Sequence, residues 1–411
     1  MSTTSTPPET RRPSVLRLPA TVVRLGVVSL MNDASSEMIF PLLPVFLRST
    51  LGLSESAAAL ALGWMEGLAE SANSLLRLAA GWLGDRLPRR KPLVLGGYAL
   101  ASATRPLIAL VTAPWQLVVL RFVDRVGKGV RGAPRDALIA DSVDPARRGL
   151  AFGFHRSMDH LGAIVGPGLA WLLLLLAPGR YRLVFALAAV PAIGSLFVLA
   201  GVRERERPRP SPPEEEGMAQ TKRPSAPLPR SLWLLLGILF LFTLGNASDA
   251  FLLLRARELG VPAAALPLIW MVLHIVKSAG STPAGWLSDR IPRRRLIAAG
   301  WGVYAVTYAG FAWAGAAWHA WALFALYGVY FGLVEGTEKA MVADLAPAAA
   351  RSTAFGAYNF AVGLGALPAS LVSGYLWKWF GAPIALGFGA GVALLAAVLL
   401  LVAPLRTPAR P

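Results

Sequence analysis

The chain has 411 residues, of which 55% are hydrophobic and 15% charged, and it carries a formal net charge of +17. So small a charged fraction disfavours a soluble protein of this length, and apolar runs of about 20 residues, each long enough to cross a membrane as a helix, recur along the sequence. The absence of cysteine excludes disulfides, thiolate metal sites and cysteine catalysis.

The apolar runs fall on both sides of a polar break, and we expect an all-α membrane protein of twelve transmembrane helices in two pseudo-symmetric six-helix bundles. The break at residues 203–230 is rich in proline and charge, so we predict a disordered cytoplasmic linker. The bundles then span residues 20–202 and 231–404. Residues 1–19 and 405–411 are expected to be tails, because the N-terminal stretch lacks the pattern of a cleaved signal peptide.

Lysine and arginine concentrate in the tails, the linker and the loops on one side of the predicted membrane. The positive-inside rule places that side in the cytoplasm, so we expect a multi-pass protein of the inner or plasma membrane with both termini cytoplasmic. This distribution accounts for the positive net charge by topology, and it disfavours nucleic acid as a partner.

Polar residues interrupt the first apolar run, in the segment MNDASSEMIF at residues 31–40. Asp33 and Glu37 are four residues apart, so they share a helix face, and the helical rise places Asp33 near the bilayer centre. Ionisable residues at this depth are costly and usually functional. A carboxylate without a partner at low dielectric can take up or release a proton near neutral pH. We therefore take these two residues as the first candidates for proton coupling.

The second predicted helix carries a polar stripe. Glu66, Glu70, Asn73 and Arg77 follow one another at intervals of three or four residues, so they share a face. Glu66 lies at about the same depth as Asp33 when the helical rise is counted. The stripe is therefore expected to face a polar cavity and not lipid.

A short basic stretch follows this helix and occurs twice in the chain. GWLGDRLPRRK at residues 81–91 returns as GWLSDRIPRRR at residues 285–295. The alignment continues between ADSVDPARRGLAFGFH at residues 140–155 and ADLAPAAARSTAFGAY at residues 343–358. An internal repeat of this length indicates two structurally similar halves.

The repeated stretch resembles the signature of the major facilitator superfamily of secondary transporters, Gly-x-Leu-x-Asp-Arg-x-Gly-Arg-Arg/Lys, although Pro88 and Pro292 stand at the usual glycine. The resemblance covers nearly the whole chain and implies the major facilitator fold. It also implies that the loop is a latch whose aspartates cap or pair with neighbouring helix ends and hold one access state closed. The residues at matching positions are Asp85, Arg86, Arg89, Asp289, Arg290 and Arg293.

Elementary electrostatics supports this role, because a carboxylate beside a helix N-terminus is stabilised by unpaired amide donors and by the helix dipole. A simpler interpretation stays open for the arginines, which could serve only to orient the loop in the cytoplasm. That interpretation leaves an aspartate at the same position in both copies unexplained.

The fourth predicted helix carries a basic stripe of Arg121, Arg125, Lys128 and Arg135. Arg125, followed by Gly129, resembles the arginine motif of the superfamily, which implies that it tunes a neighbouring carboxylate. Guanidinium groups in a dry cavity bind carboxylate or phosphate well. With Arg131 added, the stripe therefore motivates an organic anion or a sugar phosphate as an alternative substrate.

The fifth predicted helix adds Asp159 at membrane depth. Acidic and basic groups could also neutralise one another as contacts between helices. The candidates for proton coupling or substrate binding are Asp33, Glu37, Glu66, Glu70, Arg125, Lys128 and Asp159.

Gly162, Gly166 and Pro167 of this helix resemble a motif of proton antiporters that export drugs. Small residues at this spacing let two helices approach closely, and the proline favours a kink. The motif's final glycine pair is missing, since Ala170 and Trp171 stand there. Pro41 and Pro44 of the first helix resemble the proline pair of the same exporters.

The second half contains fewer charges than the first. Its ionisable residues at membrane depth are Asp249, His274, Lys277, Glu335 and Glu338. Its aromatic residues could form an apolar substrate wall, although helix packing is the simpler role for each: Trp270, Trp301, Tyr304, Phe331 and Tyr358.

The sequence contains neither a phosphate-binding glycine loop nor a nucleophile arrangement, so we expect a transporter driven by a gradient and not an enzyme. We expect no cofactor. We also expect no metal, because His155 and Asp159 are one helical turn apart whereas His160 points about 100° away from Asp159. We predict a monomeric, proton-coupled secondary transporter that works by alternating access, as an exporter in substrate:proton antiport. The alternatives are the organic-anion or sugar-phosphate carrier and a non-transporting membrane sensor or assembly subunit.

Overall fold

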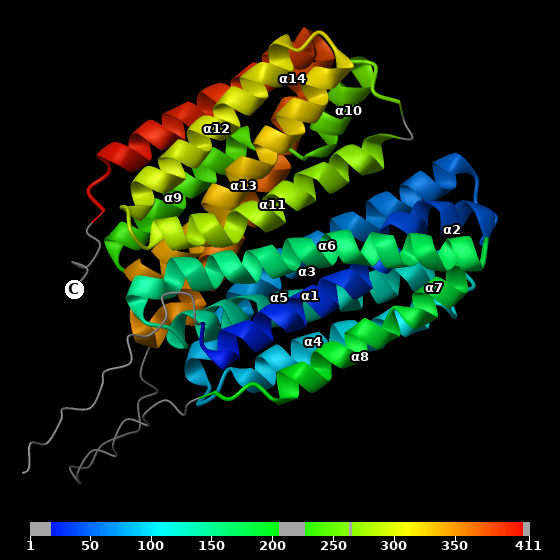
Figure 1. Ribbon diagram of the computed structural model, residues 1–411, viewed down its shortest axis with the longest axis horizontal. Coiled ribbons are helices and arrows are strands. Elements are labelled where there is room, and N and C mark those ends of the chain that lie inside the picture. The colour runs from blue at the N-terminus through cyan, green and yellow to red at the C-terminus, as the bar shows by residue number, and fades with distance from the viewer. Residues whose placement is uncertain (1–17, 205–226, 263–264, 406–411) are drawn as a thin grey trace, which may run out of the picture.

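The computed structural model describes residues 18–204, 227–262 and 265–405, and these segments are built from helices and their connections (Figure 1). The remaining parts of the predicted tails and linker lie outside the described residues. Within α3, the side chains of residues 55–64 and 66–71 are likewise not described.

The first bundle in Figure 1 contains the elements before the linker. They are α1 (Ala20–Ile39), η1 (Phe40–Leu42), α2 (Leu43–Ser49), α3 (Glu55–Arg86), α4 (Lys91–Ile108), α5 (Pro114–Asp141), η2 (Pro145–Arg147), α6 (Arg148–Leu176), α7 (Tyr181–Leu187) and α8 (Ala189–Ala200). Pro41 and Pro44 lie at the starts of η1 and α2, where the missing backbone donors of proline end the regular turns of α1.

The second bundle contains the elements after the linker. They are α9 (Arg230–Gly245), α10 (Ala250–Glu258), α11 (Leu266–Ser288), α12 (Arg293–Trp313), α13 (Ala317–Leu345), η4 (Ala348–Ala350) and α14 (Arg351–Val402). Gly381 divides α14 into two helical segments, because its φ of 83° and ψ of 172° are not helical. Glycine adopts this positive φ without steric strain.

The two bundles meet along α6 and α11 and along α3 and α14 (Figure 1). Small residues allow the backbones to approach closely at these crossings. A Cβ atom on Gly285 of α11 would lie 2.9 Å from the Cα of Gly153 in α6, and one on Gly81 of α3 would lie 3.2 Å from the Cα of Gly356 in α14. Gly81 and Gly285 occupy the same position in the two copies of the repeat, so the interface is itself pseudo-symmetric.

Six helices in the described part of the chain are long and apolar enough to cross a membrane. They lie at residues 145–176, 181–200, 230–258, 293–313, 317–345 and 348–402. The α5 helix is not among them, because its basic stripe lowers its hydropathy.

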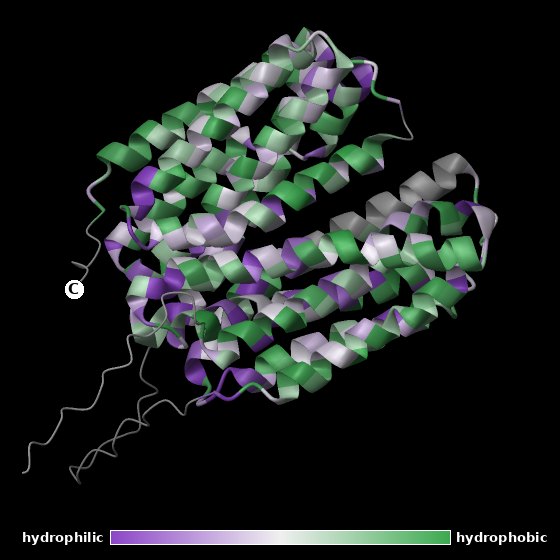
Figure 2. Cartoon of the chain, in the orientation of Figure 1, coloured by the Kyte–Doolittle hydropathy of each residue, from purple (hydrophilic) through white to green (hydrophobic). Residues whose placement is uncertain are grey.

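Large apolar side chains are exposed on the outside of the bundles, where Trp313 is 83% and Phe197 76% accessible. In Figure 2 hydrophobic residues cover much of the outer helices, and hydrophilic residues gather at the end of the molecule where α6 and α14 begin. Such a surface fits a hydrocarbon layer.

Candidate functional site

A cavity of about 360 Å³ lies between the bundles. Helices of both bundles contribute to its walls, and its described lining is strongly charged, with nine Lys or Arg side chains against five Asp or Glu. The basic residues are Arg77, Arg105, Arg121, Arg125, Lys128, Arg131, Arg135, Arg156 and Lys339. The acidic residues are Asp33, Glu37, Asp124, Asp136 and Asp159. The described walls therefore carry an excess of positive charge.

Asp33 and Glu37 of α1 both line this cavity, as their depth and spacing predict. Asp33 accepts a hydrogen bond of 2.9 Å from the side-chain amide of Asn32. Neither carboxylate forms an ion pair with a described residue, but Lys128 of α5 attracts both electrostatically. The two groups are thus placed where cavity water or a substrate can reach them.

The basic stripe of α5 forms one wall of the cavity, because residues three or four apart share a helix face. Arg131 stacks on the Tyr98 ring at 4.1 Å, and Arg135 pairs with Asp136 at 3.0 Å. Arg125, by contrast, forms no hydrogen bond or ion pair with any side chain that the structure describes, and its Nε is buried. It is therefore the cation of this wall most available to a bound anion.

Asp159 lines the cavity, and its carboxylate is already paired, which is the alternative that the sequence left open. It accepts hydrogen bonds from Arg156, at 3.0 Å, and from Ser29. His155 Nδ1 lies 3.5 Å from the same carboxylate. Asp159 therefore compensates basic groups of its own helix.

Two sets of charged residues at the cavity were not predicted from the sequence. Arg105 of α4 donates hydrogen bonds of 2.9 and 2.8 Å to the backbone and side-chain oxygens of Asn32 and lies 3.6 Å from Asp124. Asp136 of α5 pairs with Lys339 of α13, which joins the two bundles. Arg105 interrupts an apolar run just as Asp33 does, so the same depth criterion could have found it.

A second set of polar contacts joins the two bundles at the edge of the cavity. Glu335 of α13 lies 2.8 Å from His160 Nε2 and 3.9 Å from Arg156 Nε, both on α6. His160 also faces His274 of α11, with ring centroids 5.5 Å apart.

The remaining candidates of the second helix and the aromatic residues are placed differently. The side chains of Glu66 and Glu70 lie outside the described residues, whereas Arg77 lines the cavity and donates to Asn359 of α14 at 3.0 Å. The five aromatic residues considered for a substrate wall are absent from the described cavity lining, and Trp301 stacks on Phe242 in the core of the second bundle.

The repeated loops lie at one end of the molecule, which we call the gate end: the ends of α3 and α11 and the starts of α6 and α14. The carboxylate of Asp85 accepts backbone N–H bonds of 3.0 and 2.6 Å from Ser352 and Thr353, at the start of α14. Asp289 accepts two bonds of 2.8 Å from Gly149 and Leu150, at the start of α6. Each aspartate therefore binds a helix N-terminus of the opposite bundle, which suits its charge.

Ion pairs extend each aspartate contact into a network between the bundles. Arg90 lies 3.0 Å from Asp85 and also pairs with Asp141, which in turn pairs with Arg351 of the other bundle. In the second copy, the corresponding network comprises Asp289, Arg293, Asp344 and Arg148, with distances of 3.1, 3.1 and 2.9 Å.

The arginines of the loops have unequal positions. Arg86 and Arg290 lie over the rings of Trp82 and Trp286, at 3.5 and 3.2 Å, and Arg89 is exposed. In the first copy the buried partner of the aspartate is Arg90, which was not among the residues predicted from the motif. The rest of the network could have been found from the alignment of residues 140–155 with 343–358, in which Asp141 matches Asp344 and Arg148 matches Arg351.

Gly162 and Gly166 of α6 pack against α1. A Cβ atom on Gly162 would lie 2.6 Å from the carbonyl oxygen of Leu30, and one on Gly166 would lie 2.9 Å from the Cβ of Glu37. The α6 helix continues through Pro167. The small residues therefore bring Asp33 and Glu37 close to α6.

Comparison with known families identifies this architecture. The profile of the Major Facilitator Superfamily matches residues 25–370 and, in an overlapping second match, 256–411. The chain belongs to the major facilitator superfamily. Members of this family are transporters and not enzymes, and the chain is accordingly a multi-pass membrane protein.

Curated relatives within the superfamily include proteins of archaea and bacteria. An uncharacterised MFS-type transporter of Methanocaldococcus jannaschii is 35% identical over 387 residues, which are 92% of this chain and 94% of the relative. The multidrug resistance protein MdtH of Photorhabdus laumondii is 31% identical over 137 residues, which are 33% of each chain.

Solved structures of the superfamily share the fold. The human organic anion transporter MFSD10 superimposes with a TM-score of 0.74 at 16% identity, over 93% of this chain and 100% of the other. The proton:xylose symporter XylE superimposes with a TM-score of 0.74 at 14% identity, over 94% of this chain and 96% of the other. At these identities the likeness concerns the fold alone.

Proposed function

We propose that this MFS protein is a proton-coupled secondary transporter of small organic anions that works by alternating access. The main observation behind the proposal is the positive charge of the described cavity lining, which contains nine basic and five acidic side chains. Among the basic residues, Arg125 has no described partner. Carboxylate and phosphate groups bind guanidinium groups through paired, charge-assisted hydrogen bonds. The human organic anion transporter of the same fold adds support by analogy.

The transport cycle would use twelve membrane crossings in two six-helix halves with cytoplasmic termini. The gate contacts hold the halves together at one end, and their release would let the halves rock about the cavity. The duplicated networks around Asp85 and Asp289 support this role, because a protein without two access states has no evident need for them.

In this proposal, electrostatic linkage determines whether the proton and the anion move in the same direction or in opposite directions. Protonation of Asp33 or Glu37 removes a negative charge beside Lys128 and Arg125, so an anion then binds more tightly. By reciprocity, a bound anion favours protonation of the same carboxylates. Proton and anion would therefore move together, as in symport.

Export by substrate:proton antiport is the second candidate. It is supported by the resemblance of Gly162, Gly166 and Pro167 to the antiporter motif and by the partial match to the drug-resistance protein MdtH. In antiport, the proton and the substrate would compete for binding to the carboxylates of α1. A cationic or neutral substrate is compatible with such competition.

One experiment separates the two candidates. The protein is reconstituted in liposomes that enclose a pH-sensitive dye, and lactate, succinate or glucose 6-phosphate is added outside, with a cationic dye such as ethidium as the contrasting probe. Acidification of the lumen by an anion supports anion symport, and alkalinisation by a probe supports antiport. Unchanged lumen pH with every probe would contradict proton-coupled transport and favour the sensor or assembly role.

A further inference from the structure

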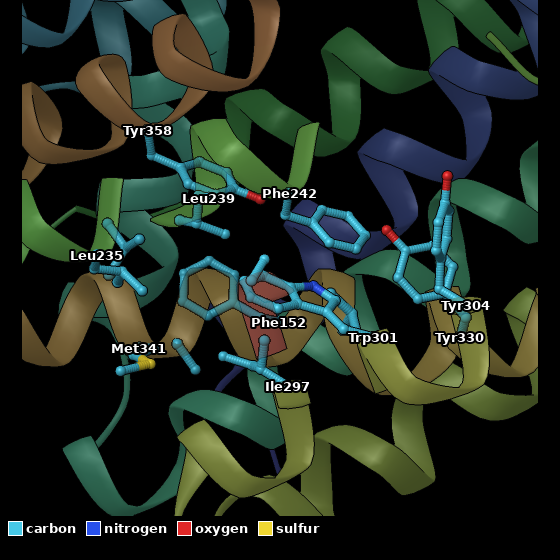
Figure 3. Packing of buried hydrophobic residues seen from close by; sticks show 14 of the residues in the cluster. Phe152, Leu235, Leu239, Phe242, Ile297, Trp301, Tyr304, Tyr330, Met341 and Tyr358 are labelled. Carbon is cyan, nitrogen blue, oxygen red and sulfur yellow. The ribbon is translucent and has the colours of Figure 1, made fainter. Parts of the chain in front are cut away.

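Glu338 of α13 is a buried carboxylate that the proposed cavity does not use. The residue is 7% exposed and does not belong to the described cavity lining. One of its carboxylate oxygens accepts a hydrogen bond of 3.3 Å from the indole nitrogen of Trp301, on α12. The other lies 2.8 Å from the phenolic oxygen of Tyr358, on α14. Figure 3 shows these two aromatic side chains directed into the same packed cluster, with Phe242 beside them.

Glu338 differs from its ionisable neighbours because both its hydrogen-bond partners are neutral. Glu335, one turn earlier, contacts His160 and Arg156, and Lys339 pairs with Asp136. No described Lys, Arg or His forms an ion pair with Glu338.

The surroundings of Glu338 contain few charges. The charged groups that act on it from a greater distance are Glu335 of its own helix and Arg156 of α6. Tyr330 of α13 is a further titratable neighbour. The side chains that α9 contributes to this cluster, among them Leu239 and Phe242, are apolar (Figure 3).

A carboxylate in such a place is unfavourable in its charged form, because burying a charge without a counterion costs far more than burying a hydrogen-bonded neutral group. The neutral acid satisfies the same partners. Its carbonyl oxygen accepts from Trp301, and its hydroxyl donates to the Tyr358 oxygen, which is both a donor and an acceptor.

We propose that Glu338 is a proton-binding site of the second bundle, separate from the carboxylates of the cavity, and that it holds a proton in the conformation described. Its position also suits a change of proton affinity during transport. Phe152 of α6 packs into the same cluster (Figure 3). Its ring centroid lies 5.6 Å from that of Phe355 on α14. Separation of the bundles would withdraw Phe152 and admit water toward Glu338. This use in coupling rests on the proposed transport function, whereas protonation of Glu338 does not.

The test measures the proton directly and needs no substrate. Infrared spectra of the purified protein in liposomes are recorded at neutral pH in water and in deuterium oxide, and the carbonyl band of protonated carboxylic acids is compared between variants. Glu338→Gln is expected to lose the intensity of one carboxylic acid. The matched control Glu335→Gln, which removes an ion-paired carboxylate of the same helix, is expected to retain it.

A second variant keeps the test decisive if Glu338→Gln folds poorly. Tyr358→Phe removes one hydrogen bond and should shift the same component of the band without removing it. An unchanged band in Glu338→Gln, or in Tyr358→Phe when only that variant folds, would overturn the proposal. Because the measurement uses protons alone, its outcome is independent of whether any anion is transported.

Discussion

At the scale of single residues, Arg125 gives the most direct prediction, because it has no described partner and can bind an anion. Arg125→Gln should weaken anion binding, because a charge-assisted hydrogen bond contributes about 1.5–3 kcal/mol, which corresponds to roughly 10- to 150-fold in the dissociation constant. Calorimetric titration of the purified protein with succinate and glucose 6-phosphate measures the change. Arg180→Gln removes the same charge from an exposed loop before α7 and should leave affinity unchanged. Equal affinities for the two variants would show that Arg125 does not contact the anion.

Asp33 allows a second prediction at this scale, because an amide at this position reproduces the neutral form of the side chain. Asp33→Asn should abolish accumulation driven by a pH gradient while exchange of labelled anion across the membrane continues. Glu37→Gln should give a milder defect, since Glu37 lies further along α1 and outside the Asn32 hydrogen bond. Counterflow and gradient-driven uptake are measured on the same vesicles at several pH values. Full gradient-driven accumulation by both variants would exclude these carboxylates from coupling.

Sequence reasoning located part of this site and missed part of it, for a physical reason. Depth and helical spacing placed Asp33, Glu37 and Arg125 on one cavity, because these properties depend on a single helix. The pairing of Asp136 with Lys339 depends on the packing of α5 against α13, which no spacing within one helix reveals. The contacts of Asp159 with Arg156 and His155, by contrast, lie within α6 at spacings that the sequence already contains.

At the scale of elements, each gate aspartate joins the end of one helix to the start of another. Asp85→Asn and Asp289→Asn keep the shape but remove the charge that two backbone N–H groups and a buried arginine stabilise. A loss of about 1.4 kcal/mol would change the ratio of the two access states tenfold. We expect each variant to insert normally and to populate the state opened at the gate end.

Spin labels can measure this shift, since the chain has no native cysteine. Cysteines at the exposed positions Arg89 and Ala349 would report the separation of the bundles at the gate end. Asp144→Asn is the matched control, because Asp144 caps η2 within one bundle through the N–H of Ala146. If the distance distribution in Asp85→Asn is identical to that in the control, Asp85 does not hold the two bundles together at the gate end.

At the scale of the whole molecule, the sequence repeat corresponds to a repeat of contacts. Gly81 and Gly285 mark the two close crossings, and the aligned blocks at 140–155 and 343–358 supply the helix starts that the aspartates bind. The repeat predicted two similar halves. It could not predict that each motif binds the opposite half, because an alignment compares positions and contains no information on which surfaces meet.

Gly285 offers the most direct test of the closed gate. A Cβ atom at this position would lie 2.9 Å from both the carbonyl carbon of Gly149 and the Cα of Gly153, and these backbone atoms cannot move aside like a side chain. Gly285→Leu should therefore exclude the conformation described here and hold the protein open at the gate end, with anion transport lost and folding retained. Gly391→Leu places the same side chain on an exposed face of α14, where no atom outside the adjoining helix backbone lies within 4 Å of the added Cβ. The Arg89 and Ala349 labels should show only the longer separation in Gly285→Leu and an unchanged distribution in Gly391→Leu. If Gly285→Leu keeps both the short separation and wild-type transport, close contact of α6 and α11 is not required for the cycle.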